Sequence, residues 1–255
     1  MGRAIAIVIG VDKGPAIDKY GLATLTYAEN GAEQIATFAR TLGYDPVVTL
    51  VGPQATFERV DKALREAGEV NPPWDTVLLV FSGHGIRKDS GLRCDHWKDE
   101  HWCLYNDLMV DDHLLMRTQK FAPKTKLFIV ADCCFAGGGS GMYGLPMLLQ
   151  RAAGFLSNLF TWKPKAWEND VDTGRKAVPD FDCSPPRAKV LLLASSSQAV
   201  SDAGPFMRAF LKASSDPTAL SSFNAFADRV RTLGGRPVLR PKGSPLRTEP
   251  AFKPQ

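Results

Sequence analysis

The chain has 255 residues, of which 44% are hydrophobic and 23% are charged, and its formal net charge at pH 7 is +4. This length and composition are typical of one large globular domain with a substantial hydrophobic core. They argue against a membrane-spanning chain, because no apolar run approaches ~20 residues, and the charge is too small to indicate direct nucleic-acid binding.

Apolar runs and amphipathic stretches alternate along the chain. In chain order, the pattern predicts a strand at 4–9, a helix at 28–42, a strand at 46–51, a helix at 56–67, strands at 76–81, 126–131 and 190–194, helices at 205–213 and 220–233, and a strand at 237–239. Several of the strands are apolar throughout, which indicates a parallel sheet covered on both faces. The predicted fold class is therefore α/β.

Three segments depart from this alternation. Residues 86–110 are polar and aromatic and suit a loop or a hairpin excursion. Residues 138–187 follow a glycine cluster and form a long insert, which is usually functional or disordered. Residues 241–255 are rich in proline, and the basic residues that gather from Arg229 onward are interpreted as a solvated surface and a tail.

Two segments with reactive side chains follow directly on predicted strands. Residues 82–85 (Ser-Gly-His-Gly) follow the strand at 76–81, and residues 132–134 (Asp-Cys-Cys) follow the strand at 126–131. In open α/β sheets, ligands bind beyond the carboxyl ends of the strands. A cysteine nucleophile needs a base that is near in space, and two neighbouring parallel strands that end in His and Cys supply one.

The two adjacent cysteines are distinguished by the alternation of side chains along a strand. If the alternation continues, Asp132 and Cys134 point to one side and Cys133 points to the other. Cys133 is then expected to pack as a small apolar residue. Cys134 is the predicted nucleophile.

These segments resemble a known family. Residues 81–85 and 132–137 resemble the paired His and Cys blocks of caspase-like cysteine peptidases, most closely those of the metacaspases and their bacterial relatives. His84 and Cys134 are 50 positions apart, and the caspase spacing is about 50. Further stretches resemble the family, so that the resemblance covers most of residues 3–240; they are residues 21–30, 102–115, 194–198 and 204–206.

The resemblance implies a six-stranded, mostly parallel sheet with helices on both faces. It implies one caspase-like peptidase domain at 1–240 with a large-subunit-like part at 1–137, a linker or insert at 138–187 and a small-subunit-like part at 188–240, followed by a C-terminal tail at 241–255.

The resemblance also implies a cysteine endopeptidase that works through an acyl-enzyme. Cys134 attacks the scissile carbonyl, and His84 moves the protons. The backbone N–H groups of Gly85 and Cys134 are the implied oxyanion donors.

The same resemblance assigns substrate-binding roles to Asp132 and Ser195. A carboxylate at the pocket base favours Arg or Lys as the residue before the scissile bond, called P1. The family's second pocket acid is replaced here by Gly31, and Glu29 is expected to point differently. A further family acid is replaced by Ser197.

Other interpretations of these residues stay open. His84 is alternatively a hydrogen-bonded core histidine, Asp132 a helix cap, and the whole chain a catalytically silent scaffold that binds proteins. A further alternative is a different cysteine hydrolase on a flavodoxin-like sheet. Such an enzyme should lack the Ser-Gly-His-Gly segment, which this chain has at residues 82–85. Zinc binding is an alternative role for four Cys and His side chains, although their spacing is not a common zinc pattern. These residues are Cys94, His96, His101 and Cys103.

The expected partners are a protein or peptide substrate and an activating partner protein. No cofactor or metal is expected, and calcium dependence stays open because no acidic cluster can be assigned to it. Self-cleavage in the insert is a hypothesis, with basic candidates at Arg151, Lys163, Lys165, Arg175 and Lys176. The odd number of cysteines and the lack of a signal-peptide pattern indicate the cytoplasm. By analogy, the setting is bacterial defence or cell death.

Overall fold

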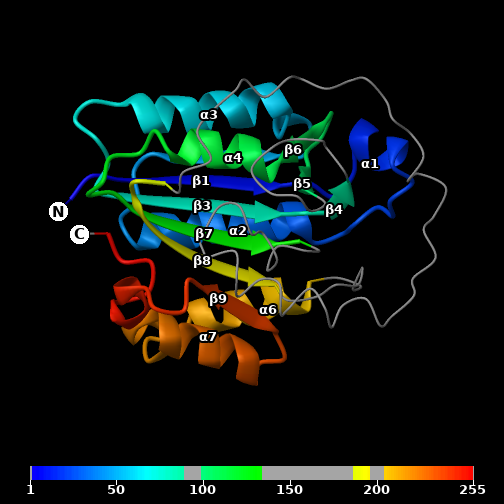
Figure 1. Ribbon diagram of the computed structural model, residues 1–255. Coiled ribbons are helices and arrows are strands. Elements are labelled where there is room, and N and C mark those ends of the chain that lie inside the picture. Colours follow the sequence, from blue (N-terminus) through cyan, green and yellow to red (C-terminus); the bar gives the residue numbers. More distant parts are fainter. Residues whose placement is uncertain (1, 89–98, 134–185, 196–203, 255) are drawn as a thin grey trace, which may run out of the picture.

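The computed structural model describes residues 2–88, 99–133, 186–195 and 204–254 (Figure 1). Its main sheet has six strands in the order β2-β1-β3-β7-β8-β9. The strands are β1 (Ala4–Gly10), β2 (Val47–Val51), β3 (Thr76–Ser82), β7 (Lys126–Asp132), β8 (Lys189–Ser195) and β9 (Pro237–Arg240). The first five are parallel and β9 is antiparallel to β8, which confirms the predicted fold class.

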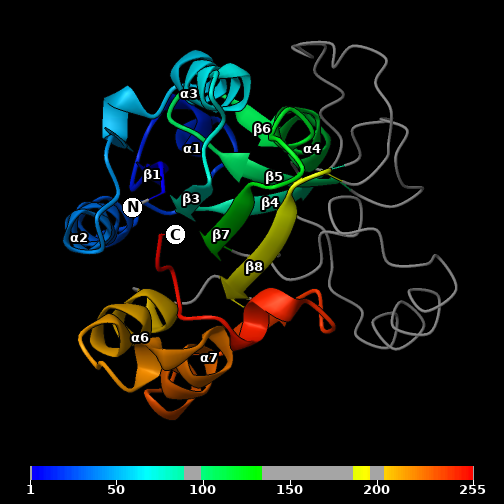
Figure 2. The same cartoon turned by 90° about the vertical axis from the view of Figure 1, so that its left-hand side faces the viewer.

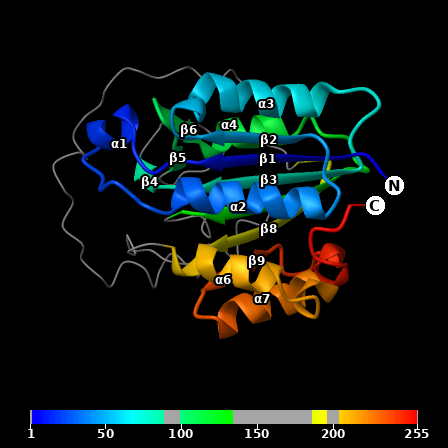
Figure 3. The same ribbon diagram turned by 180° about the vertical axis from the view of Figure 1, so that it is seen from behind.

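Helices cover both faces of this sheet. The helices α3 (Phe57–Glu69) and α4 (Asp111–Thr118) lie on one face, and α2 (Ala28–Thr41), α6 (Pro205–Ser214) and α7 (Phe223–Thr232) lie on the other (Figures 1 and 3). All residues of β1, β3 and β7 are buried, and alternate positions enter two separate hydrophobic clusters. Strands buried on both faces explain the uninterrupted apolar runs of the sequence.

A second, antiparallel sheet lies at the carboxyl ends of the parallel strands, next to α1 (Pro15–Lys19) (Figures 1 and 2). Its strands are β4 (Gly85–Lys88), β5 (Asp99–Cys103) and β6 (Leu108–Val110), in that order. The expected excursion at 86–110 is thus a hairpin that continues into a third strand. It projects from the end of β3, directly after His84.

The segment after β9 corrects the interpretation of residues 241–255 as a solvated tail. A short 3₁₀ helix (Pro245–Thr248) leads to Phe252, whose side chain is fully buried. The Phe252 ring packs edge-on against Phe226 and against Phe223, with centroids 5.1 Å and 4.7 Å away. Tyr44 donates a hydrogen bond to the Phe252 carbonyl at 2.8 Å. The segment is held because Phe252 completes an aromatic cluster beneath the sheet.

Candidate active site

Four positions form a row across the carboxyl ends of the parallel strands. Gly10, Ser82 and Asp132 are partners in register on β1, β3 and β7. Ser195 continues the row on β8, because the preceding residues of β7 and β8 are paired. Val130, two positions before Asp132, packs in the cluster beside α2 and α6. The side chains of the row therefore face these helices.

Asp132 is a buried acid with an unused acceptor. Only 5% of the residue is exposed, and its Oδ2 atom finds no hydrogen-bond partner among the described residues. Burial raises the pKa of Asp132 to about 7, although a hydrogen bond from the backbone N–H of Met207 lowers it in part. Met207 lies in the first turn of α6, where N–H groups lack helical partners. The first turn of α6 is thus partly capped by an acid from β7.

Ser82 is a second polar group in the row, and no functional role was predicted for it from the sequence. It is fully buried, and its Oγ atom has no hydrogen-bond partner within the described part of the chain. Its register partner is Asp132. Two orphaned buried polar atoms on neighbouring strands are unusual, and together they favour a polar or cationic ligand group. The available signal was a serine that ends an otherwise apolar strand.

Gly31 is the position at which the resemblance implies a second pocket acid in related chains. A Cβ atom built on Gly31 would lie 2.7 Å from Cγ of Met207. The Met207 side chain therefore fills the space next to the missing acid. Glu29 points elsewhere: its Oε1 atom accepts a hydrogen bond from the Asp12 N–H at 3.1 Å, and its carboxylate lies against Gly52.

His84 is held by one hydrogen bond in a defined tautomer. Its Nε2 atom lies 2.6 Å from the carbonyl oxygen of Ala23. A carbonyl can only accept, so Nε2 carries the proton and Nδ1 keeps its lone pair in the neutral ring. Burial lowers the pKa of His84, while the Ala23 hydrogen bond and the charge of Asp12 act in the opposite direction. The neutral ring, the form that accepts a proton, is favoured.

Asp12 organises the segment that presents the Ala23 carbonyl. Its Oδ1 atom accepts hydrogen bonds from the N–H groups of Tyr27 at 3.1 Å and Ala28 at 2.7 Å, at the start of α2. Its own carbonyl accepts from Leu25 at 2.8 Å. One acid thus caps a helix and fixes the loop behind His84.

Gly85 begins β4 with its backbone groups turned away from β5. The N–H of Cys103 donates to the His84 carbonyl at 3.0 Å, and Gly85 is the register partner of Trp102. Hydrogen-bonded and non-bonded pairs alternate in an antiparallel ladder, so Gly85 occupies a non-bonded pair. Its N–H is therefore directed to the outer edge of β4, as an oxyanion donor requires. The Trp102 ring stacks on Phe81 with centroids 4.6 Å apart.

Cys133 packs in the hydrophobic cluster beside α3 and α4, opposite to the side that Asp132 faces. The predicted alternation is confirmed for these two residues. Cys134 lies outside the described residues, as do Cys94, His96, Ser197 and residues 138–185 of the insert. His101 and Cys103 are buried on β5. Among the described residues, no three His, Cys, Asp or Glu side chains gather as a metal site would require.

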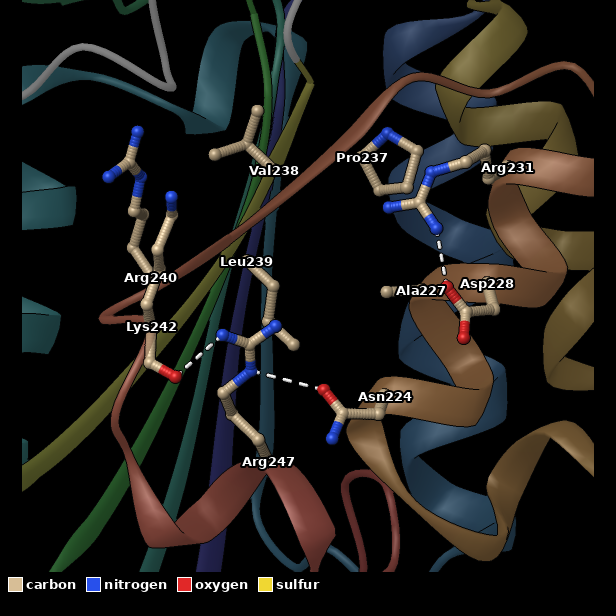
Figure 4. A pocket seen from close by; sticks show the side chains of 10 residues that line it. All are labelled: Asn224, Ala227, Asp228, Arg231, Pro237, Val238, Leu239, Arg240, Lys242 and Arg247. Carbon is tan, nitrogen blue, oxygen red and sulfur yellow. Dashed lines mark hydrogen bonds and ion pairs between the residues drawn. The ribbon is translucent and has the colours of Figure 1, made fainter.

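A groove of about 340 Å³ lies apart from this row, along β9, α7 and the 3₁₀ helix (Figure 4). Two of its four basic side chains are engaged within the groove. Arg231 pairs with Asp228, and Arg247 donates to Asn224 at 3.1 Å and to the Lys242 carbonyl at 2.7 Å. The one carboxylate of the groove, Asp228, is held in the ion pair with Arg231, and no Cys, Ser, Thr or His side chain lines the groove, so the strand-end row is the candidate active site.

The chain matches a known family and a known fold. The caspase domain family matches residues 3–235. The chain belongs to the caspase domain family of peptidases. Among solved structures, protein GSU0716 from Geobacter sulfurreducens, a structural genomics target, is similar with a TM-score of 0.67 and 19% identity over 99% of both chains. This likeness shows a shared fold. Curated protein sequences gave no significant match.

A membrane helix is not found in the described part of the chain: none of its helices combines the length and the apolar character that a span requires.

Proposed function

We propose that the protein is a cysteine endopeptidase of the metacaspase type that cleaves after Arg or Lys. Cys134 is the nucleophile and His84 is its acid/base partner. The observation that carries the proposal is the buried carboxylate of Asp132, which has an unused oxygen and lies at the end of the strand next to the one that leads to His84. A lysine or arginine side chain would supply the missing partner by a charge-assisted hydrogen bond.

In the proposed reaction, Nδ1 of His84 accepts the thiol proton of Cys134, and the thiolate attacks the scissile carbonyl. The N–H groups of Gly85 and Cys134 stabilise the oxyanion. The imidazolium then donates its proton to the leaving amine, and an acyl-enzyme remains. A water molecule gives a proton to His84, attacks the thioester carbonyl and releases the acid product with a restored thiol.

The substrate pocket in this proposal has one acid, Asp132, with the hydroxyl groups of Ser82 and Ser195 beside it. The Arg or Lys preference thus depends on a single charge. A reducing cytoplasm keeps Cys134 as a thiol. The proposal includes activation by a partner protein or by self-cleavage in the insert, in a bacterial defence or cell-death setting.

The test is hydrolysis of fluorogenic peptides with Arg, Lys, Asp or Leu at P1, with and without calcium. Wild-type protein is compared with Cys134→Ala and, as the matched control, Cys133→Ala. Cleavage after Arg or Lys that is lost only in Cys134→Ala supports the proposal. Cleavage after Asp or Leu would keep the enzyme and reject the pocket. If no peptide is cleaved under any condition, two accounts remain, a catalytically silent scaffold and a peptidase that needs its activating partner, and the partner is then the next thing to identify.

A further inference from the structure

The outer edge of β4 offers backbone groups beside the candidate oxyanion site. β4 is the first strand of the order β4-β5-β6, so no described strand pairs with its other edge. In the ladder with β5, Ile86 and Lys88 lie in hydrogen-bonded positions, and Gly85 and Arg87 lie in non-bonded positions. The N–H and C=O groups of Gly85 and Arg87 therefore face outward.

This edge has a fixed position relative to the catalytic groups. β4 begins at the residue after His84, and the His84 carbonyl is bonded to β5. The stacking of Trp102 on Phe81 attaches β5 to the main sheet. An exposed strand edge is a template for pairing with another chain, and this one begins at the expected oxyanion donor.

We propose that the outer edge of β4 binds the leaving side of the substrate as an added parallel strand. The proposal rests on the proposed function, which places the acyl side of the peptide beside Ser195 on β8 and the scissile carbonyl at the N–H of Gly85. β8 and the small sheet lie on opposite sides of the ends of β3 and β7 (Figures 1 and 2). A peptide that arrives along β8 therefore leaves along β4.

The register of such a strand follows from the parallel hydrogen-bond pattern. The N–H of Gly85 binds the P1 carbonyl. The C=O of Gly85 then accepts the N–H of P2′, the second residue after the scissile bond, and the N–H of Arg87 donates to the P2′ carbonyl. The N–H of the next residue, P3′, points away from β4. If the peptide instead ran antiparallel to β4, the residues before the scissile bond would lie along β4.

The first experiment uses wild-type protein and peptides that extend to the fourth residue after the cleaved bond. Methylation of the P2′ nitrogen removes one predicted hydrogen bond and should lower kcat/KM about fivefold or more. Methylation of the P3′ nitrogen is the matched control and should leave kcat/KM unchanged. Equal effects at the two positions, or an effect confined to the acyl side, would overturn the proposal.

The second experiment removes the enzyme's own donor. Arg87→Pro lacks the outward N–H, and proline is tolerated at such edge positions; Arg87→Ala keeps the N–H. Arg87→Pro should lose about fivefold in kcat/KM for the extended peptide and nothing for a P1 coumarin amide, while Arg87→Ala should match the wild type. Full activity of Arg87→Pro on the extended peptide would overturn the inference alone. Absence of cleavage of both substrates by the wild type would overturn the proposed function with it.

Discussion

The N–H of Met207 donates a hydrogen bond to the carboxyl group of Asp132. This contact joins the first turn of α6 to the end of β7, and it uses only part of the acceptor capacity of the acid. The other oxygen is buried and has no partner in the described structure. The helix thus holds Asp132 in place, and the remaining oxygen stays available for a ligand.

Replacement of Asp132 by Asn should remove the preference for basic residues. The side chain keeps its shape and its acceptor for Met207, but it loses the charge that pairs with Arg or Lys. Loss of one partner of a buried charge pair typically costs about 2–5 kcal/mol, so kcat/KM for Arg and Lys peptides should fall about 30- to 5,000-fold. Asp228→Asn, on the exposed face of α7, is the control. An unchanged Arg or Lys rate in Asp132→Asn would show that another group binds P1.

Gly31 and Met207 should limit the pocket to one acid. Gly31→Asp alone should destabilise the fold, because its Cβ would lie 2.7 Å from Met207 Cγ. The double variant Gly31→Asp/Met207→Ala removes the clash and restores a two-acid pocket. It should bind Arg peptides more tightly than Met207→Ala alone, by about tenfold in KM. Equal KM values for these two variants would indicate that position 31 does not face the substrate.

The stability of the fold should decrease with rising pH because of Asp132. Its pKa is raised to about 7 in the folded state, from 3.8, so the folded protein binds more protons than the unfolded chain between these values. The resulting stabilisation is complete below about pH 4 and is lost as the pH rises to 7. The stability advantage of Asp132→Asn over the wild type should therefore grow from pH 4 to pH 7 in urea unfolding.

Asp61 should affect the pH dependence of stability in the direction opposite to Asp132. Burial acts to raise its pKa, but hydrogen bonds from Arg117 and His113 lower the pKa overall. Stability from Asp61 is present above its unfolded pKa and is lost as the pH falls. The destabilisation caused by Asp61→Asn should thus shrink toward acid pH. The same direction of change in both variants would contradict these assignments.

The strands of the main sheet could be predicted from the sequence because the buried strands are continuous apolar runs, such as residues 76–81. The helix α4 was not predicted, because its residues are buried on nearly all sides and its sequence therefore shows no amphipathic period. The tail was misjudged because one aromatic residue, Phe252, anchors a polar and proline-rich segment. The reactive segments were found because strand ends concentrate chemistry. Ser82 ends an otherwise apolar strand, but its place in the candidate site follows from its register with Asp132 and its orphaned hydroxyl.

The pH dependence of kcat/KM, which reports on the free enzyme, should differ from the pH dependence of kcat, which reports on the enzyme–substrate complex. In the free enzyme, a cationic substrate needs ionised Asp132, whose pKa is about 7, and neutral His84, whose pKa is lowered mainly by burial. The acid limb of kcat/KM for Arg peptides should then fall near pH 7. A bound cation stabilises the charged acid, so the acid limb of kcat should lie at lower pH. Coincident limbs for kcat and kcat/KM would argue against Asp132 as the P1 acid.

Phe252 should be a major contributor to stability although it lies outside the matched family domain. Its ring is fully buried and also contacts Phe128 and Phe210. Phe252→Ala leaves a cavity in this cluster and should lower the free energy of unfolding by about 3–5 kcal/mol, measured by urea denaturation. Lys253→Ala, at the exposed neighbouring position, should change it by less than about 0.5 kcal/mol. If the two variants were equally stable, the C-terminal segment would be dispensable and the aromatic cluster would close without it.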